Sequence, residues 1–203
     1  MKKIITIGRQ YGSGGHEIGE LVAKKLGIPF FDKELILLAA EKSGLSRDVI
    51  ERADETSVNS FLYAISTGSY FLGGMFPGRV PELPVTDQLY MAQAEIIKEN
   101  ANKGPCVFVG RCADAILEDR CDVLRVFIRA EEEDRIDRIA ERIDVDKKEA
   151  KDLIAKVDKR RSSYYDFYAQ RHWGAVENYD LLINHSRIST EEAVEMIAAL
   201  FDK

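Results

Sequence analysis

The chain has 203 residues, of which 45% are hydrophobic and 32% charged, so it can bury a substantial core as one compact domain. Its 29 basic side chains against 35 acidic ones give a net charge of −6, which argues against a protein that coats nucleic acid through a bulk positive field. Any binding of anions must therefore be local. No apolar run approaches the roughly 20 residues of a membrane span, so we expect no membrane partner and a cytoplasmic location.

The chain contains three cysteines, Cys106, Cys112 and Cys121, without the close spacing of a redox or metal-ligand pair. Their odd number fits reduced thiols in a cytosolic setting better than a disulfide framework or a zinc site. Because apolar residues flank them, we expect all three to serve as small core residues.

The first part of the chain alternates strand-like and helical patterns. The expected elements are a strand over residues 3–7, a helix ending at Leu26, a strand over 30–32, and helical pieces from 34 to about 65. Gly27 and Pro29 end the first helix. Residues 68–84 are rich in glycine and proline, which predicts a long loop of the kind that often covers a binding site.

The second part continues this alternation. The expected elements are a helix over 86–102, a strand over 106–109, a helix over 113–117, a strand over 123–128, helices over 131–143 and 146–168, a strand over 180–184, and a closing helix. Capping boxes begin two of these helices, Asp146 with Glu149 and Ser189 with Glu192. Five strands separated by helices predict an α/β fold whose parallel sheet is covered on both faces, with binding sites at the carboxyl ends of the strands.

A glycine-rich segment between the first strand and the first helix is the sharpest local feature. It reads Gly8-Arg9-Gln10-Tyr11-Gly12-Ser13-Gly14-Gly15-His16-Glu17-Ile18-Gly19. Glycines let successive backbone N–H groups converge on an anion, and the following helix N-terminus adds partial positive charge. The GxxxxGK(S/T) pattern fails, because Gly15 stands where the lysine belongs and His16 where the magnesium-binding hydroxyl begins. The loop sequence alone fits two interpretations, an ordinary strand-to-helix turn and a phosphate-binding loop.

Neighbouring side chains favour the phosphate loop. We expect Arg9 to supply the missing cation, and Ser13 or Glu17 to lie near a metal ion. His16, His172 and His185 are too widely spread for a metal-ligand pattern, and only His16 is a site candidate by its position.

Arginines in the second half of the chain have to be judged by placement, because the charges of residues 111–171 nearly cancel. Arg135, Arg138 and Arg142 share one stripe of their helix, where phosphate binding and pairing with the acidic residues Glu131, Glu132, Asp134 and Asp137 both remain open. Arg161 falls within the apolar stripe of the next helix, and Arg160 at its edge. Asp158 or a ligand phosphate would satisfy Arg161, and we favour the ligand.

Two polar residues follow predicted strands. Arg111 comes after the strand over 106–109 through Gly110, and Asp32 ends the second strand. Both therefore lie at the carboxyl edge, where ligands bind in open parallel sheets. The aromatic run over 164–168 and Trp173 is expected to pack in the core or a lid.

Several segments together resemble the bacterial cytidylate kinase-like family, a branch of the P-loop nucleoside monophosphate kinases. They are ITIGRQYGSGGHEIG, GIPFFDKELI, PCVFVGRCADAIL, and VDKRRSSYYDFY followed by HWG and ENYDLLIN. The resemblance covers nearly the whole chain. It implies a three-layer P-loop kinase fold with a five-stranded parallel sheet, ATP as donor, a nucleoside monophosphate as acceptor with a CMP-like one favoured, and Mg²⁺. It also implies one domain with a core of residues 1–32, 103–130 and 175–203, an acceptor-binding helical region at about 33–102, and an arginine-bearing lid at about 131–174.

The resemblance also assigns site residues by position. The expected catalytic set is Arg111, Arg160, Arg161 and Asp32, and the expected nucleotide-binding set is Gly8, Arg9, Gly12, Ser13, Gly14, Gly15, His16, Glu17, Arg135 and Arg138. The loop lysine is absent, and the GRD of authentic cytidylate kinases is Gly110-Arg111-Cys112 here. A nucleotide-binding regulator with weak or no catalysis, and a kinase of another small metabolite, are therefore the alternative functions.

Overall fold

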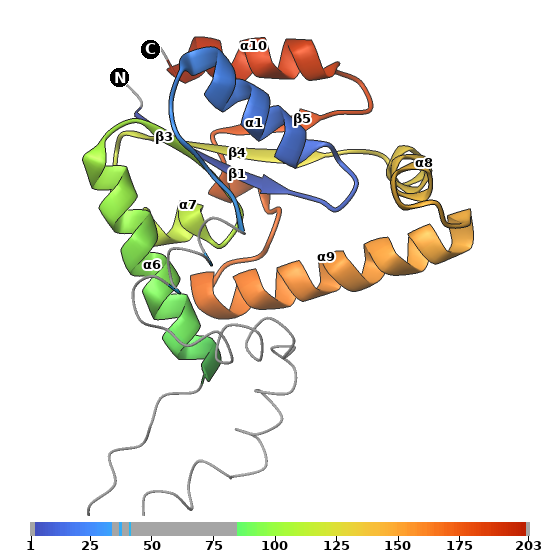
Figure 1. Ribbon diagram of the computed structural model, residues 1–203, viewed down its shortest axis with the longest axis horizontal. Coiled ribbons are helices and arrows are strands. Elements are labelled where there is room, and N and C mark those ends of the chain that lie inside the picture. The colour runs from blue at the N-terminus through green and yellow to red at the C-terminus, as the bar shows by residue number, and fades with distance from the viewer. Residues whose placement is uncertain (1–2, 34–36, 38–40, 42–84, 202–203) are drawn as a thin grey trace, which may run out of the picture.

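The computed structural model describes residues 3–33, 37, 41 and 85–201 and contains one parallel sheet (Figure 1). Its five strands lie in the order β2-β3-β1-β4-β5. Their bounds are β1 Ile4–Arg9, β2 Phe30–Phe31, β3 Cys106–Val109, β4 Val123–Arg129 and β5 Leu181–Asn184. In the central register, Ile7 of β1 lies between Val109 of β3 and Val126 of β4. The predicted five-stranded parallel sheet is confirmed.

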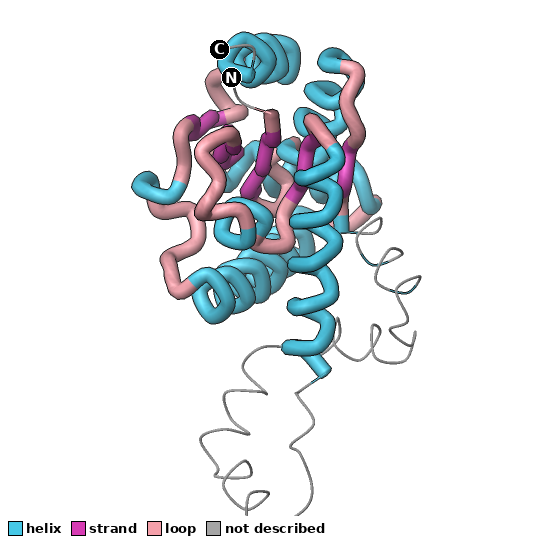
Figure 2. Tube along the Cα trace, turned by 90° about the vertical axis from the view of Figure 1, so that its left-hand side faces the viewer, coloured by secondary structure: helices cyan, strands magenta, loops and turns pink. Residues whose placement is uncertain are grey.

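Helices cover both faces of the sheet, which makes three layers (Figures 1 and 2). Helices α1 (Gly15–Leu26) and α10 (Thr190–Phe201) pack together on one face. Helices α6 (Val85–Lys103), α7 (Ala113–Ile116) and the long α9 (Lys147–Ala169) lie on the other side. Helix α8 (Glu132–Ile143) packs against α9 beyond the sheet edge, and the short 3₁₀ helix η2 (Val176–Asn178) precedes β5.

The strands are apolar on both faces because both faces are covered. Successive side chains point to opposite sides of a strand, so Ile5 and Ile7 pack toward α1 and α10, whereas Ile4 packs toward α6 and α7. Phe108 in β3 is completely buried on the second side. The packed sheet thus fixes where each strand ends, and these ends carry the site.

Most predicted elements are confirmed within two residues. The clearest difference is β1, which continues past residue 7 because Gly8 and Arg9 pair with Phe127 and Ile128 of β4. Both capping boxes form: Asp146 Oδ1 accepts from the Glu149 N–H (2.8 Å), and Ser189 and Glu192 exchange hydrogen bonds of 2.9 and 3.2 Å. Apart from residues 37 and 41, the predicted helical pieces over 34–65 and the predicted loop over 68–84 lie outside the described residues.

All three cysteines are free thiols, as expected. Cys106 and Cys112 are buried core residues, and burial raises the pKa of the Cys106 thiol to about 12. The prediction was wrong for Cys121, which is exposed because it lies in the turn before β4.

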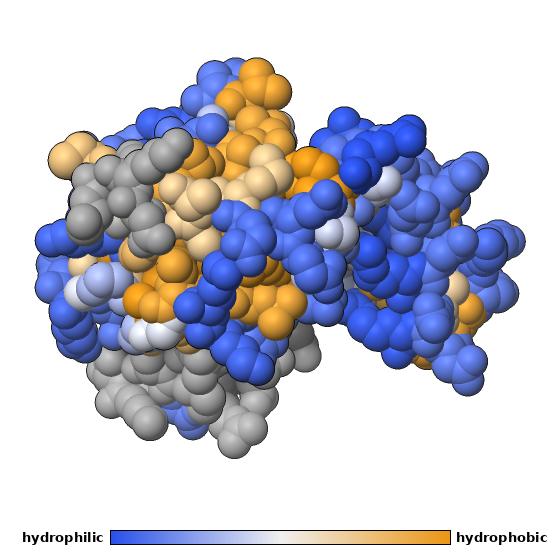
Figure 3. Space-filling view, turned by 90° about the horizontal axis from the view of Figure 1, so that it is seen from above, coloured by the Kyte–Doolittle hydropathy of each residue, from blue (hydrophilic) through white to orange (hydrophobic). Residues whose placement is uncertain are grey.

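The lobe formed by α8 and the beginning of α9 has a strongly hydrophilic surface (Figure 3). Across residues 3–33 and 85–201, no helix is both long and apolar enough to cross a membrane. On the lobe, Lys147 pairs with Asp137 (2.7 Å) and Lys151 with Glu132 (2.8 Å). These acidic residues of α8 thus pair with lysines of α9 rather than with the arginines of their own helix.

Candidate functional site

The segment between β1 and α1 is a tight loop that depends on glycine. Gly12 and Gly14 have φ values of +80° and +81°, which side-chain-bearing residues rarely adopt. The first hydrogen bond of the α1 backbone runs from the Ile18 N–H to the Gly14 carbonyl (3.0 Å). The N–H groups of the preceding turn therefore lie at the positive end of the helix dipole, in the arrangement of an anion site.

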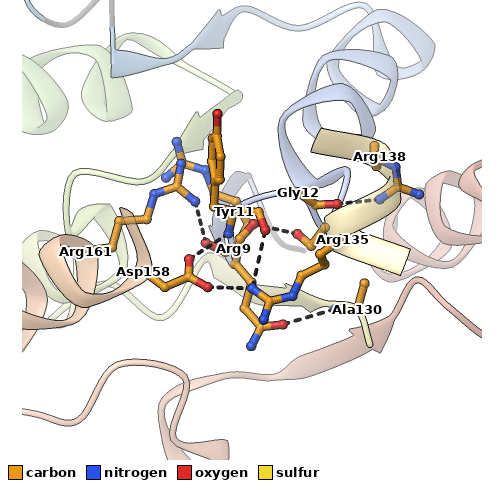
Figure 4. Close-up of polar contacts among 10 residues, drawn as sticks. Arg9, Tyr11, Gly12, Ala130, Arg135, Arg138, Asp158 and Arg161 are labelled. Atoms are coloured by element: carbon orange, nitrogen blue, oxygen red, sulfur yellow. Dashed lines mark hydrogen bonds and ion pairs between the residues drawn. The ribbon is translucent and has the colours of Figure 1, made fainter. Parts of the chain in front are cut away.

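Basic side chains from other elements donate hydrogen bonds to four carbonyl oxygens of this loop, and Figure 4 shows the three that come from arginines. The pairs are Arg161 with the Arg9 carbonyl (3.0 Å), Arg135 with that of Tyr11 (3.3 Å), Arg138 with that of Gly12 (2.7 Å), and His185 with that of Ser13 (2.8 Å). The lid arginines of the sequence analysis thus contact the loop backbone.

Arg135 and Asp158 form a largely buried ion pair at 2.5 Å. The other oxygen of Asp158 accepts from the Tyr11 N–H at 2.7 Å, so the pair ties α8 and α9 to the loop (Figure 4). Asp158 was considered as the partner of Arg161, but its ion pair is with Arg135. The Arg161 guanidinium instead lies 5.5 Å from the centre of the Tyr11 ring and donates to the loop carbonyl.

The turn after β3 has an unusual backbone. Gly110, Arg111 and Cys112 have successive φ values of +80°, +55° and +54°. A non-glycine residue in this region costs roughly 1–2 kcal/mol, and such strain concentrates at functional sites. The turn places the Arg111 guanidinium 6.0 Å from the centre of the Tyr164 ring.

Arg9 lies beside this second turn. The Arg9 guanidinium packs directly against Gly110, where a Cβ would overlap it. Burial, followed by the nearby charges of Arg161 and Arg111, lowers the pKa of Arg9 to about 9. Its Nε is buried without a hydrogen-bond partner. Arg9 is expected from the sequence to serve the donor loop, but its guanidinium lies near Arg111 and Arg161, which are expected on the acceptor side.

These arginines line one cavity of about 160 Å³ between the strand ends and α9. Its lining includes the basic side chains of Lys33, Arg9, Arg111, Arg160 and Arg161 and the aromatic side chains of Tyr164, Tyr165, Tyr168, Trp173 and Tyr179. The aromatic rings also pack on one another as expected, for example Tyr90 on Tyr168 with centroids 4.1 Å apart. The cavity therefore combines positive charge with flat apolar surfaces.

Asp114, in the first turn of α7, contributes a buried carboxyl to the cavity wall. Its Oδ2 accepts a 2.6 Å hydrogen bond from the Tyr165 hydroxyl. Desolvation raises the pKa of Asp114, with the Tyr165 hydrogen bond acting in the opposite direction.

His16 and Asp32 contact each other, with Nε2 and Oδ2 3.1 Å apart. This contact joins the start of α1 to the end of β2. Glu17 is exposed on the first turn of α1, whereas Ser13 is fully buried and its hydroxyl donates to the Gln10 carbonyl (2.9 Å). The Ser13 hydroxyl therefore points into the loop. Of the two residues expected near a metal ion, Glu17 is the one whose side chain is exposed.

Over residues 3–33 and 85–201, no group of three His, Cys, Asp or Glu side chains is arranged to hold a metal ion.

The sequence did not predict the roles of four residues at this site, which are His185, Tyr11, Asp114 and Asp158. His185 directly follows β5. Arg111 and Asp32 were expected at the site because they follow strands, and the same reasoning applies to His185. Asp158 depends on a partner 147 residues away along the chain, which no local pattern reveals.

A model of the cytidylate kinase-like family matches residues 4–187. The chain belongs to this family. The family and the P-loop kinase fold support a nucleotide or small-molecule kinase in general. No curated protein matches this cytidylate kinase-like chain.

Solved structures share the fold of this family member over nearly its whole length. An uncharacterized protein from Eubacterium ventriosum ATCC 27560 has a TM-score of 0.74 and 28% identity, over 100% of this chain and 99% of that chain. A shikimate kinase from Bacteroides thetaiotaomicron has a TM-score of 0.52 and 14% identity, over 98% of each chain. A gluconokinase from Sinorhizobium meliloti 1021 has a TM-score of 0.52 and 16% identity, over 100% of this chain and 96% of that chain.

Proposed function

We propose that this protein transfers the γ-phosphoryl group of ATP to a nucleoside monophosphate, with a CMP-like acceptor favoured. The observation that carries the proposal is the convergence of Arg9, Arg111 and Arg161 in the lining of a cavity that also carries aromatic side chains. This cavity lies directly beside the glycine loop, since Arg9 and Gly8 belong to both.

The glycine loop is the proposed donor site. The backbone N–H groups of Gly12, Gly14 and Gly15 and the N-terminus of α1 suit the donor phosphates. Mg²⁺, bound with ATP, would neutralise charge on the transferring group, and Glu17 is the residue proposed to lie near it. His16, which contacts Asp32, is proposed to link this site to the acceptor side.

The part of the cavity around Arg9, Arg111 and Arg161 is the proposed acceptor-phosphate site. An anion there would give the buried Arg9 Nε a hydrogen-bond partner and offset the repulsion among three guanidinium groups. Arginine suits this task, because its planar fork binds two phosphate oxygens at once. Arg160, exposed on α9, is proposed to close over the same phosphate.

The aromatic side chains of the cavity favour an acceptor that carries a flat ring. Tyr164, Tyr168 and Trp173 offer ring surfaces, and aromatic pairs add roughly 0.5–1.5 kcal/mol beyond their buried area. A saturated small metabolite would gain less from these surfaces.

The transfer itself needs positioning and charge stabilisation. An anionic oxygen of the acceptor phosphate attacks the γ-phosphorus in line, the bond to the bridging oxygen breaks, and its electron pair leaves with ADP. The attacking oxygen carries no proton, so this step requires no general base. Arg111 and Arg161 are proposed to stabilise the charge on the transferring group.

A coupled ATP-consumption screen over nucleoside monophosphates, with the labelled product identified, tests this proposal. We expect a phosphorylated nucleotide product, and Arg111→Ala should lower kcat/KM by about 10³-fold or more. Arg129→Ala is the matched control, because Arg129 is an exposed arginine paired with Glu131 away from the cavity. Unchanged kinetics in Arg111→Ala would contradict the proposal. ATP binding without any product would instead favour a regulator, and a non-nucleotide product another small-molecule kinase.

A further inference from the structure

The carbonyl contacts of the phosphate loop share one chemistry. Each of the four donors is basic, and they come from three separate parts of the fold: α8, α9 and the residue after β5. The two contacts nearest the start of α1 are those of Arg138 with Gly12 and His185 with Ser13. They flank Gly14, where a Cβ would lie 2.7 Å from His185 Nδ1 and 3.3 Å from Arg138 Nη1.

The direction of a carbonyl fixes the direction of the next N–H. In a trans peptide the C=O and the N–H point to opposite sides of one plane. When His185 holds the Ser13 carbonyl, the N–H of Gly14 is therefore turned to the other side of the loop. Converging N–H groups of this kind form an anion-binding concavity.

We propose that His185 and Arg138 are positioning residues of the phosphate loop in a chain that lacks the loop lysine. His185 turns the Gly14 N–H toward the donor phosphates, and Arg138 fixes the preceding peptide, whose Ser13 N–H donates to the Gln10 carbonyl at 3.3 Å. This inference rests on the proposed function of the loop as the donor site. The two side chains act from outside the loop, on carbonyl oxygens rather than on the nucleotide.

The hydrogen bonds of His185 define its tautomer. A carbonyl oxygen only accepts, so Nδ1 carries the proton that is donated to Ser13 at 2.8 Å. In the neutral ring, Nε2 then accepts from the Thr190 hydroxyl at 3.0 Å. Because Thr190 is the first residue of α10, the imidazole connects the loop to a helix of the packed core.

Arg138 differs from His185 in carrying a permanent charge. Its Nη1 donates to the Gly12 carbonyl at 2.7 Å (Figure 4), and the rest of the guanidinium keeps further N–H donors. Arg138→Gln keeps an amide donor without the charge, and Arg138→Met removes both. The pair of variants therefore separates the hydrogen bond from the charge.

Calorimetric titration with ATP and steady-state kinetics of the full chain test the inference. His185→Phe keeps a ring but removes the donor, so we expect the Kd and KM for ATP to rise by about 3- to 10-fold, with the acceptor KM unchanged. His185→Asn places an amide N–H near the position of Nδ1–H and should recover most of the loss. Arg187 is an exposed arginine in the turn that contains His185, so Arg187→Ala controls for the loss of a nearby positive charge.

Each outcome decides between the two proposals. Wild-type ATP affinity in both His185→Phe and Arg138→Met would overturn the positioning role and leave the proposed function intact. Weakened ATP binding in these variants, in a protein that phosphorylates no acceptor, would support the positioning role and overturn the proposed function. A wild-type protein that binds no ATP would overturn both. If His185→Phe does not fold, as judged by its unfolding midpoint, Arg138→Met against Arg138→Gln decides the question.

Discussion

Two turns follow neighbouring strands of the sheet, and they solve the same geometric problem in different ways. The turn after β1 reaches the left-handed backbone region at Gly12 and Gly14. The turn after β3 reaches it at Gly110 and then continues through Arg111 and Cys112, which both carry side chains. The first turn presents backbone groups, whereas the second presents a guanidinium.

The difference shows where each turn gets its stability. The loop after β1 avoids the backbone penalty by using glycine, and basic side chains from other elements hold its carbonyls. The turn after β3 retains backbone strain. Two contacts stabilise it: the packing of buried Cys112, and the hydrogen bond from the Ala113 N–H to the Gly110 carbonyl (3.2 Å). Strain is thus retained where a side chain is needed and avoided where only the backbone is needed.

The largest effect should come from adding one methyl group to the first turn. In Gly14→Ala the Cβ would lie 2.7 Å from the His185 ring, at a φ of +81°. We expect ATP affinity to fall by at least about 100-fold and the free energy of unfolding to fall by about 2–4 kcal/mol, because strain and overlap add.

Gly27→Ala is the matched control for this change. Gly27 ends α1 with a φ of +66°, and nothing lies within 4 Å of its would-be Cβ. Urea unfolding should show a loss of only about 1–2 kcal/mol, with ATP affinity kept. Equal losses in the two variants would show that close approach by His185 contributes nothing.

The second turn gives a sharper separation of stability from function. Arg111→Gly and Arg111→Ala both remove the guanidinium, so both should lose phosphoryl transfer. Glycine relieves the left-handed strain at a φ of +55°, so Arg111→Gly should unfold with a free energy about 1 kcal/mol higher than that of Arg111→Ala. Denaturant titration of the two variants measures this difference, and a more stable alanine variant would contradict retained strain.

The two turns also differ in how far the sequence predicts them. Gly12 and Gly14 are visible in the sequence because turns of this geometry favour glycine, and Arg111 because it follows a buried strand through Gly110. Strand and helix bounds followed from apolar periodicity and capping boxes, since these depend on local chemistry. The end of β1 depended on pairing with β4, which no local pattern encodes.

Contacts between distant elements were the main limit for the site. The strand-end rule brought Arg111 and Asp32 to one edge, but it did not show that Asp32 contacts His16 or that Arg9 lies against Gly110. Nor did a helical stripe reveal that Arg138 would bind the Gly12 carbonyl instead of facing an acidic residue of its own helix. Side chains as long as arginine reach several alternative partners, and only the packed fold selects one.

The smallest effect concerns the helices that follow the two turns, each of which has an acidic residue in its first turn. Glu17 of α1 is exposed, whereas Asp114 of α7 is 7% exposed, and burial raises the pKa of Asp114 above its ordinary value of 3.8. The folded protein therefore holds this proton to higher pH than the unfolded chain, so stability is lost as the pH rises from about 3.8 through the folded-state pKa. Asp114→Asn removes that loss, so its free energy of unfolding relative to wild type should increase between pH 4 and pH 7. Glu17→Gln should show no such trend, and urea titrations at the two pH values would contradict the burial argument if both variants behaved alike.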